Sequence, residues 1–333
     1  MKTPKPSRCA SIDIGSNTVR LLIVDTHCSP PDKLHPLFID SDITRLGEDF
    51  KTERTIKKRP EKRTLVALKK FSKTIDRLKV QRVAAAGTAV LREASNRETF
   101  LDEVYNKTGI KTRVLSGIEE AQLSLKGISR TMGIRRCPLL IFDIGGGSTE
   151  VIYSPESNIG IHQPYIKSLP IGVVPLTEEF LPTDPPGEKK CEELKSALKP
   201  VFKEVYMDIL NVSGRNPGFS FPEELIGTAG TPTTLAAMFL KMHQYDPKKI
   251  TGTRLQYAWL VKLARKLFAM PLRQRRYLAG LENGREDVIL AGLLVVIVLM
   301  ETFHFSSLVV SDAGLLEGLA WDLIDPDPLI NWE

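Results

Sequence analysis

Two stretches of the chain repeat one pattern, and this repeat decides the fold. The first is Ala10-Ser-Ile-Asp13-Ile-Gly15-Ser-Asn-Thr-Val-Arg20-Leu-Leu-Ile-Val, and the second is Leu140-Ile-Phe-Asp143-Ile-Gly145-Gly-Gly-Ser-Thr-Glu150-Val-Ile-Tyr. Each consists of an apolar strand, an Asp, a Gly-rich turn and a second apolar strand. This pattern predicts a β-hairpin whose tip turns backbone N–H groups toward an anion. Two such hairpins predict two similar halves that face each other across a phosphate-binding cleft.

The bulk composition sets the class of protein. The 333 residues are enough for two domains with separate cores, and 42% hydrophobic with 26% charged residues is typical of a soluble globular chain. The net charge of +6 suits an anionic ligand but does not by itself indicate nucleic acid. The four cysteines and five histidines are scattered without metal-ligand spacing, which favours reduced thiols in a cytosolic protein.

The N-terminus and the most apolar run argue against export and membrane insertion. No apolar segment of the signal-peptide type follows the basic residues 1–8. The run from Val288 to Met300 is too short to span a bilayer and predicts a buried core helix. We therefore expect a cytoplasmic protein with no membrane partner and no nucleic-acid partner.

The hairpin turns carry residues suited to phosphate and metal chemistry. A side chain at Gly15, or at residues 145–147, would keep a phosphate away from the backbone. Phosphate binding by the turns therefore requires glycine at these positions. The aligned Asp13 and Asp143 would repel a phosphate unless a divalent cation lay between them. Hard oxygen ligands that leave room for water point to Mg²⁺.

The segment Ser116-Gly-Ile-Glu119-Glu120-Ala offers a candidate general base. Ser116 and Glu119 have the spacing of a capping box, which accounts for Glu119 but not for Glu120. From the residues alone, two interpretations of Glu120 stay open. It is either a carboxylate favoured by the helix dipole, or the base that deprotonates a water for attack on phosphorus.

Three further features have both a plain and a functional interpretation. Glu150 is an exposed hairpin charge, or a metal ligand, or a second carboxylate near the attacking water. Arg92 is a surface arginine or a clamp on a terminal phosphate. The turn Gly227-Thr-Ala-Gly230-Thr231-Pro232 is a helix start with Thr231 at the N-cap, or a further anion contact at a helix N-terminus.

Basic residues gather in two other segments. Apolar residues at helical spacing between about residues 60 and 79 predict an amphipathic helix with a basic outer face, and the run Lys57–Arg63 at its start is typical of a solvated surface. The cluster Arg273-Gln-Arg-Arg276, with Arg285, is a solvated face or a site for a longer polyanion. The chain contains no GxxxxGK[ST], HExxH or GxSxG motif, which excludes a P-loop NTPase.

In their order along the chain, the motifs resemble those of the exopolyphosphatase and guanosine pentaphosphate phosphatase family, from about residue 8 to 322. The matching segments are Ser11-Ile-Asp-Ile-Gly-Ser-Asn-Thr-Val-Arg-Leu, Arg45-Leu-Gly, Gly87-Thr-Ala-Val-Leu-Arg-Glu-Ala-Ser-Asn, Leu115-Ser-Gly-Ile-Glu-Glu-Ala, Phe142-Asp-Ile-Gly-Gly-Gly-Ser-Thr-Glu, Ser168-Leu-Pro-Ile-Gly, Gly227-Thr-Ala-Gly-Thr, Gly284-Arg-Glu-Asp-Val-Ile and Ser311-Asp-Ala-Gly-Leu-Leu-Glu-Gly.

The resemblance implies an α/β fold, namely a duplicated actin-like fold of the acetate kinase, heat-shock cognate and actin type, built on a ribonuclease H-like motif with a cleft between two domains. The first domain is expected at residues 1–130, with the C-terminal helix of about 313–333 packed back on it, and the second at 131–312. A homodimer is left open. Two departures from the family pattern are Pro175, where many members have Arg, and Ala229, where a Gly is usual.

The resemblance also implies the chemistry. The expected activity is Mg²⁺-dependent hydrolysis, with Mn²⁺ as the alternative ion, of the terminal phosphate of inorganic polyphosphate. The chain ends at residue 333, where longer members continue, so short polyphosphate chains are the expected substrates. A guanosine pentaphosphate 5′-phosphohydrolase, a weakly catalytic sensor of guanosine tetra- or pentaphosphate, and a phosphotransferase are the alternatives.

The resemblance assigns Glu120 as the base and Arg92 as the arginine that contacts phosphate. The predicted metal ligands are Asp13, Asp143 and Glu150. The predicted phosphate-binding residues are Gly15, Ser16, Asn17, Thr18, Gly145, Gly146, Gly147, Ser148, Gly227, Gly230 and Thr231.

Overall fold

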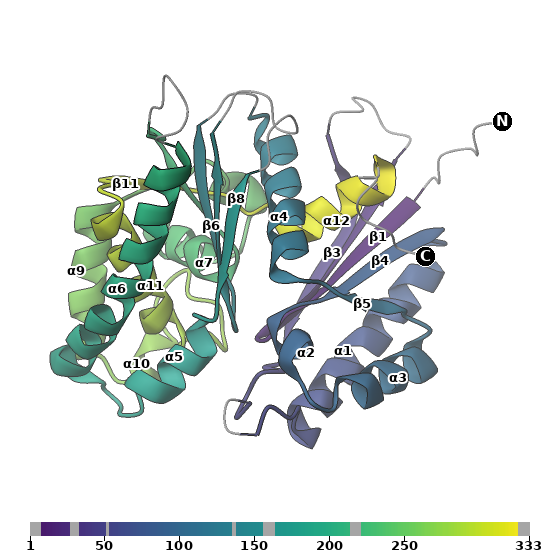
Figure 1. The fold of residues 1–333 in the computed structure, drawn as a ribbon. Helices are drawn as coiled ribbons and strands as arrows, with labels where there is room; N and C mark the ends of the chain where they lie inside the picture. Colours follow the sequence, from purple (N-terminus) through teal and green to yellow (C-terminus); the bar gives the residue numbers. More distant parts are fainter. Residues whose placement is uncertain are drawn as a thin grey trace. The chain divides into compact units, whose positions relative to one another are not determined.

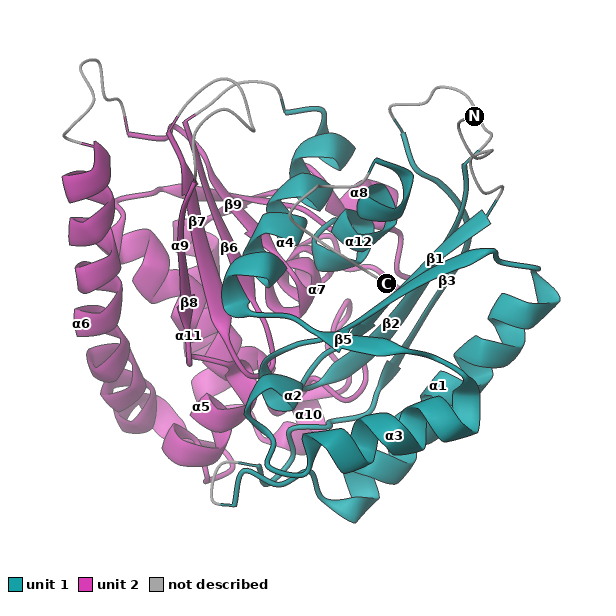
Figure 2. Ribbon diagram, turned by 45° about the vertical axis from the view of Figure 1, so that its right-hand side comes forward, with its two compact units in different colours: residues 1–134, 313–333 teal, residues 135–312 magenta. Residues whose placement is uncertain are grey.

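Two compact units make up the chain. The computed structural model describes residues 8–26, 33–50, 53–134, 138–155, 164–213 and 221–325. Unit 1 comprises residues 1–134 and 313–333, and unit 2 comprises residues 135–312 (Figure 2). The chain therefore leaves unit 1 once and returns to it near its C-terminal end.

Unit 1 is built on a five-stranded sheet with the strand order β3-β2-β1-β4-β5 (Figure 1). The strands are β1 (Arg8–Ile14), β2 (Thr18–Asp25), β3 (His35–Ile43), β4 (Arg82–Gly87) and β5 (Thr112–Val114). The first three strands are antiparallel neighbours, whereas β4 and β5 run parallel to β1. The carboxyl ends of β1, β4 and β5 consequently meet at one edge of the sheet.

Helices cover both faces of this sheet. They are α1 (Lys58–Arg77), α2 (Ala89–Glu93), α3 (Arg97–Thr108), α4 (Gly117–Met132) and α12 (Leu315–Ile324). Because side chains alternate along a strand, Ile12 and Ile14 of β1 join the core formed with α1 and α3, whereas Cys9 joins the core formed with α4 and α12. The same alternation places Asp13 on the face of the sheet that α4 and α12 cover.

Helices α4 and α12 pack unusually closely. A Cβ atom built on Gly127 would lie 2.1 Å from the Gly314 carbonyl oxygen, and one built on Gly318 would lie 1.9 Å from the Leu123 carbonyl oxygen. An ion pair also joins the same two helices, since Lys126 Nζ lies 2.6 Å from the buried Asp322 carboxylate. The C-terminal helix is therefore firmly attached to the helix that begins at Ser116.

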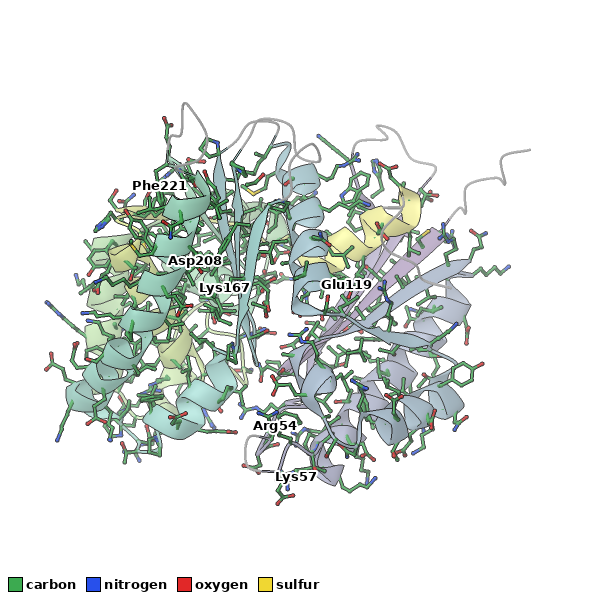
Figure 3. All side chains as sticks on the ribbon, in the orientation of Figure 1. Arg54, Lys57, Glu119, Lys167, Asp208 and Phe221 are labelled. Carbon is green, nitrogen blue, oxygen red and sulfur yellow. The ribbon has the colours of Figure 1, made fainter. Side chains whose placement is uncertain are left out.

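Unit 2 contains a six-stranded sheet with the order β10-β11-β9-β6-β7-β8. Its strands are β6 (Leu139–Ile144), β7 (Thr149–Ser154), β8 (Tyr165–Leu169), β9 (Leu225–Thr228), β10 (Arg254–Gln256) and β11 (Ser307–Val310). Its helices are α5 (Val173–Phe180), α6 (Gly187–Ser213), α7 (Gly230–Phe239), α8 (Pro247–Ile250), α9 (Tyr257–Phe268), α10 (Leu272–Arg275) and α11 (Ile289–Thr302). Lys167 on β8 reaches Asp208 on α6 at 2.9 Å and so ties the edge strand to this helix (Figure 3).

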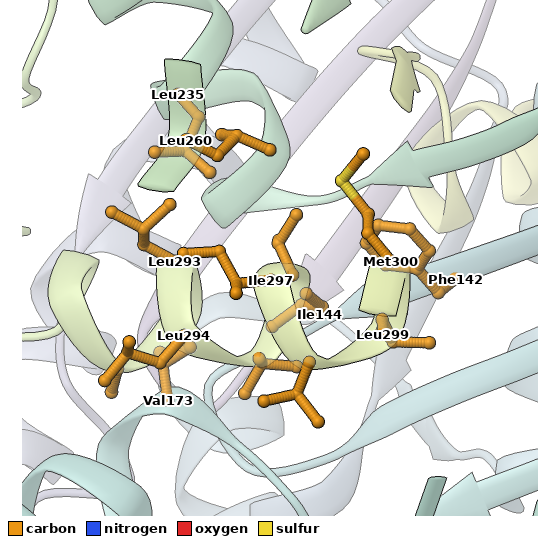
Figure 4. Close-up of a cluster of buried hydrophobic side chains, with 14 of the residues drawn as sticks. Phe142, Ile144, Val173, Leu235, Leu260, Leu293, Leu294, Ile297, Leu299 and Met300 are labelled. Atoms are coloured by element: carbon orange, nitrogen blue, oxygen red, sulfur yellow. The ribbon is translucent and has the colours of Figure 1, made fainter. Parts of the chain in front are cut away.

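The core of unit 2 surrounds α11. Leu293, Ile297 and Met300 of this helix pack with Phe142 of β6 in a cluster of buried apolar side chains (Figure 4). The expectation of a buried helix at residues 288–300 is therefore confirmed. Among the described residues, no helix combines the length and the apolar character that crossing a bilayer requires.

The two units share one topology. A hairpin, a third antiparallel strand and then parallel strands follow in the order β3-β2-β1-β4-β5 in unit 1 and β8-β7-β6-β9-β11 in unit 2. Both predicted hairpins are confirmed, as β1–β2 and β6–β7, and so is the duplicated α/β fold class. Residues 254–256 pair with β11 as the short strand β10, and α9 follows directly.

Two of the four cysteines lie in the described residues. Cys9 and Cys191 are buried free thiols, as expected for reduced cysteines, while Cys28 and Cys137 lie outside the described residues.

Candidate active site

The tip of the first hairpin is a closed backbone turn. The Gly15 N–H donates to the Thr18 carbonyl at 3.0 Å, and a Cβ atom on Gly15 would press against that same oxygen. A neighbouring loop holds the tip from outside, since Gly47 N–H donates to the Ser16 carbonyl at 2.8 Å and Arg45 N–H to the Asn17 carbonyl at 2.9 Å. The predicted phosphate-binding residues 15–18 are thereby brought into one rigid turn.

The Asn17 side chain is buried in this turn. Neither its amide oxygen nor its amide nitrogen makes a hydrogen bond to any described residue. A buried amide without partners costs about 1–3 kcal/mol, which favours a side chain that meets a ligand.

The candidate base and the candidate phosphate clamp contact each other. Arg92 Nη1 on α2 donates to Glu120 Oε2 on α4 at 2.8 Å and to the Leu115 carbonyl at 3.0 Å. Glu120 is only 8% exposed. The contact arises because β4 and β5 run parallel, so the segments that follow them begin at the same edge, where Leu115 N–H also bonds to the Gly87 carbonyl.

Glu119 has a different role from its neighbour. The predicted capping box is confirmed, because the Ser116 hydroxyl accepts from the Glu119 N–H while the Glu119 carboxylate accepts from the Ser116 N–H. Burial acts to raise the pKa of Glu119, but these hydrogen bonds and the positive charge of Arg113 outweigh it and hold the pKa below its usual value. Glu119 thus fixes the start of α4, and Glu120 faces Arg92.

The second hairpin repeats the turn of the first. The Gly145 N–H donates to the Ser148 carbonyl at 2.9 Å, as Gly15 does to Thr18. The start of α5 supports the turn, since Val173 N–H donates to the Gly145 carbonyl at 3.2 Å. A Cβ atom on Gly172 would lie 2.3 Å from Gly147 Cα, so this support depends on glycine at residue 172.

The two hairpins differ in the residue opposite the Asp. Asp13 pairs across the strands with Arg20, whereas Asp143 pairs with Glu150. Asp143 and Glu150 are both buried, at 8% and 1% exposed, and Glu150 Oε1 accepts from the Ser168 hydroxyl at 2.8 Å. The interpretation of Glu150 as an exposed charge is therefore wrong, because β8 and the rest of the sheet cover this strand.

The acidic pair of unit 2 suits a hard divalent cation. Directly opposed like charges destabilise a hairpin, and a cation between them removes that repulsion. Mg²⁺ is commonly held by one or two carboxylates together with waters and substrate phosphates, which fits Asp143 and Glu150. The described residues contain no group of three His, Cys, Asp or Glu side chains placed to hold a metal, so they offer no all-protein cage.

The third predicted phosphate segment lies beside the second hairpin. Parallel pairing of β6 with β9 sets Asp143 next to Thr228, so residues 227–231 follow on at the same sheet edge. Thr231 is not the N-cap of the helix that starts here: α7 begins at Gly230, and Ala229 precedes it. The Arg285 guanidinium closely approaches Gly230, whose Cβ atom, if present, would lie 2.2 Å from Nη1.

Ala229 adopts a backbone conformation that normally requires glycine. Its φ of 67° and ψ of −168° fall in a region that costs an L-residue about 1–3 kcal/mol. Ala229, which stands where the family usually has Gly, is therefore a site of backbone strain.

Two residues near these sites, Arg20 and Ser168, were not predicted as site residues, although the hairpin register alone would have placed Arg20 opposite Asp13. Arg285 was considered only with the basic cluster at residues 273–276, and the structure places it beside Gly230. Arg275, part of the predicted basic cluster, is instead buried and donates to main-chain carbonyls at the end of α9, so it is not available to a polyanion.

Comparison with known proteins identifies the family. The model of the Ppx/GppA phosphatase family matches residues 23–326. Exopolyphosphatase 2 of Mycobacterium tuberculosis is 30% identical over 331 residues, which are 95% of this chain and 98% of the relative. Crystal structures of the Aquifex aeolicus Ppx/GppA family member (31% identity, 97% of this chain and 99% of that chain, TM-score 0.76) and of an exopolyphosphatase from Cytophaga hutchinsonii (27%, 97% and 100%, TM-score 0.83) are similar. The protein belongs to the Ppx/GppA phosphatase family.

Proposed function

We propose that the protein is an exopolyphosphatase that hydrolyses the terminal phosphoanhydride bond of inorganic polyphosphate, with Glu120 as the general base. The observation that carries the proposal is the 2.8 Å contact between Arg92 and the buried Glu120 carboxylate. The names of similar proteins, such as Exopolyphosphatase 2 of M. tuberculosis, support the substrate class.

The Arg92–Glu120 pair suggests how the base becomes active. Arg92 makes both of its hydrogen bonds within the described residues through Nη1. A terminal phosphate is a stronger acceptor than a single carboxylate oxygen because it offers several charged oxygens to a guanidinium. When Arg92 turns to the phosphate, its contact with Glu120 Oε2 is broken, and that oxygen becomes available to accept a proton from water. Substrate binding and base activation are thereby coupled.

Each unit carries its own candidate groups for binding phosphate. The amides of residues 16–18, 146–148 and 228–231 are the proposed donors to phosphate oxygens, since the neighbouring glycines let the backbone approach an anion. Asp143 and Glu150 would hold Mg²⁺, and the Ser168 hydroxyl orients Glu150. When bound, the ion neutralises charge on the phosphate chain.

One set of assays tests the proposal. Phosphate release is measured from short polyphosphate, long polyphosphate and guanosine pentaphosphate, with and without Mg²⁺, for the wild type and Glu120→Gln. Removal of a general base costs about 10²–10⁴-fold in rate, so Glu120→Gln is expected to release little phosphate while still binding polyphosphate. The matched control is Glu119→Gln, which removes a carboxylate from the capping box one residue away and is expected to retain the rate.

Other outcomes distinguish the alternatives. Faster release from guanosine pentaphosphate than from polyphosphate would assign the nucleotide as the main substrate, because both substrates present the same terminal anhydride. Tight binding of that nucleotide without release from any substrate would indicate a sensor. Transfer of the phosphate to ADP would indicate a kinase, and an unchanged rate in Glu120→Gln would contradict the assignment of the base.

A further inference from the structure

A row of basic side chains runs along the solvent face of α1 in unit 1. The α1 basic stripe consists of five exposed residues separated by three, seven, four and four positions: Arg59, Lys62, Lys69, Lys73 and Arg77. At a rise of 1.5 Å per residue, the stripe is about 27 Å long. The exposed Val66 takes the remaining helical step between Lys62 and Lys69, and the exposed Asp76 is the one acidic residue beside the stripe at its C-terminal end.

The charges of the stripe are not neutralised by the protein. None of the five residues forms an ion pair with any residue that the structure describes, whereas cations at the borders of the same face do. Lys58 pairs with Glu61, Arg63 with Glu48 and Lys70 with Asp40. Five positive charges against the single Asp76 leave an excess of one sign along the helix, which lowers stability through self-repulsion and favours a role in attracting an extended anion.

We propose that the α1 basic stripe is an accessory binding track for the distal part of a long polyphosphate chain. The inference rests on the proposed exopolyphosphatase function. A linear polyanion releases condensed counterions when it meets a row of cations, and this gain grows with the number of charges met. The stripe would therefore raise the affinity for long chains without touching the bond that is cleaved.

The start of the stripe is connected to the candidate site within unit 1. Arg63, in the first turns of α1, donates from Nε to the Thr44 carbonyl at 2.7 Å. The backbone N–H of Thr44 donates in turn to the Asn17 carbonyl in the tip of the first hairpin at 3.0 Å. The helix that carries the stripe is thus held to the loop that supports the predicted phosphate turn.

The residues of α1 favour a bare phosphate chain over other polyanions. Phe71 is the only aromatic residue of α1 and is fully buried, so the stripe has no ring on which a nucleobase would stack. The apolar side of the helix, with Leu68 and Ile75, is buried in the core of unit 1 and is not available to a lipid surface.

The test compares long and short substrates. The variant Lys62→Gln/Lys69→Gln/Lys73→Gln removes three charges from the stripe, and Lys189→Gln/Lys203→Gln/Lys266→Gln removes three exposed charges from α6 and α9 of unit 2 as the matched control. At low ionic strength, we expect the KM for polyphosphate of several hundred units to rise about tenfold in the stripe variant, because each exposed charge contributes a factor of about two. The kcat, and the KM for tripolyphosphate, are expected to stay within twofold.

A binding measurement keeps this test separate from that of the proposed function. With Glu120→Gln as the background, long polyphosphate is titrated at several salt concentrations with and without the three stripe substitutions. The slope of log Kd against log salt is expected to fall by about 2 when three charges are removed. An equal loss in the control variant, an unchanged slope, or tighter binding of single-stranded RNA or anionic vesicles than of polyphosphate would overturn the proposal. If the wild type does not hydrolyse polyphosphate but the slope still changes in the stripe variant, the proposed exopolyphosphatase activity is refuted and the proposed binding role of the α1 basic stripe is not.

Discussion

The close packing of α4 and α12 makes Gly318 the most informative single substitution. In Gly318→Ala, the new Cβ atom would meet the Leu123 carbonyl oxygen at 1.9 Å, while an ordinary van der Waals contact begins at 3.4 Å. The obstacle is backbone on both sides, so no side-chain rotation relieves it. The two helices must therefore separate by about 1.5 Å, which forfeits contacts along their whole interface.

The expected loss can be stated in two measurable quantities. Overpacking of this kind costs about 3 kcal/mol in the free energy of unfolding, which for a unit of this size corresponds to a fall in Tm of about 10 °C. Helix α4 also carries the proposed base, Glu120, and a displacement of about 1 Å in a catalytic group reduces the rate about 100-fold. We expect Gly318→Ala to lose both stability and phosphate release.

The control for this substitution is Gly109→Ala. Gly109 ends α3 with a φ of 70°, and a Cβ atom there would meet nothing within 4 Å. It should cost about 1 kcal/mol from the left-handed conformation alone and leave the rate unchanged. A Gly318→Ala protein with normal Tm and normal activity, or an equal loss of activity in Gly109→Ala, would refute the inference that glycine at residue 318 positions α4.

Two further predictions concern strain and buried thiols. Ala229→Gly should raise the free energy of unfolding by about 1 kcal/mol, since strain of about 1–3 kcal/mol is relieved against the smaller entropic cost of glycine; urea unfolding checks this, and an unchanged or lower midpoint would contradict it. Burial raises the pKa of Cys9 to about 11 and of Cys191 to about 12, with the nearby arginine charges opposing the rise in each case. Both thiols should therefore resist iodoacetamide at pH 8 until the protein is denatured, as followed by peptide mass spectrometry. Because the folded state keeps these protons above the unfolded pKa of 9.0, its stability should fall as the pH rises from about 9 toward 11, and a flat alkaline profile would argue against this burial effect.

Features set by neighbouring residues were readable from the sequence. The two hairpins and the capping box at Ser116 depend on residues within a few positions of one another, and all are present in the structure. The local pattern was less reliable at the start of α7, where Ala229 takes a conformation that its side chain disfavours and the predicted cap at Thr231 is displaced.

Features set by distant residues were not readable. Arg92 and Glu120 are 28 positions apart, and their contact depends on the parallel pairing of β4 with β5. The burial of Glu150 likewise depends on β8, whose place beside β7 no short pattern specifies. Strand β10 exists only through its pairing with β11, some fifty residues further along the chain.

The different residues opposite Asp13 and Asp143 have a consequence for how the duplicated halves diverged. Both halves have the same hairpin turn with an Asp on its first strand, but the residue opposite that Asp carries a different charge in each half. The first half carries its own counter-charge, Arg20, encoded in the strand. The second half places Glu150 at the equivalent position, so two acidic residues oppose each other across its strands. If Mg²⁺ binds as proposed, the effect of chelators on stability is expected to originate in the second half, where the cation would lie between two carboxylates.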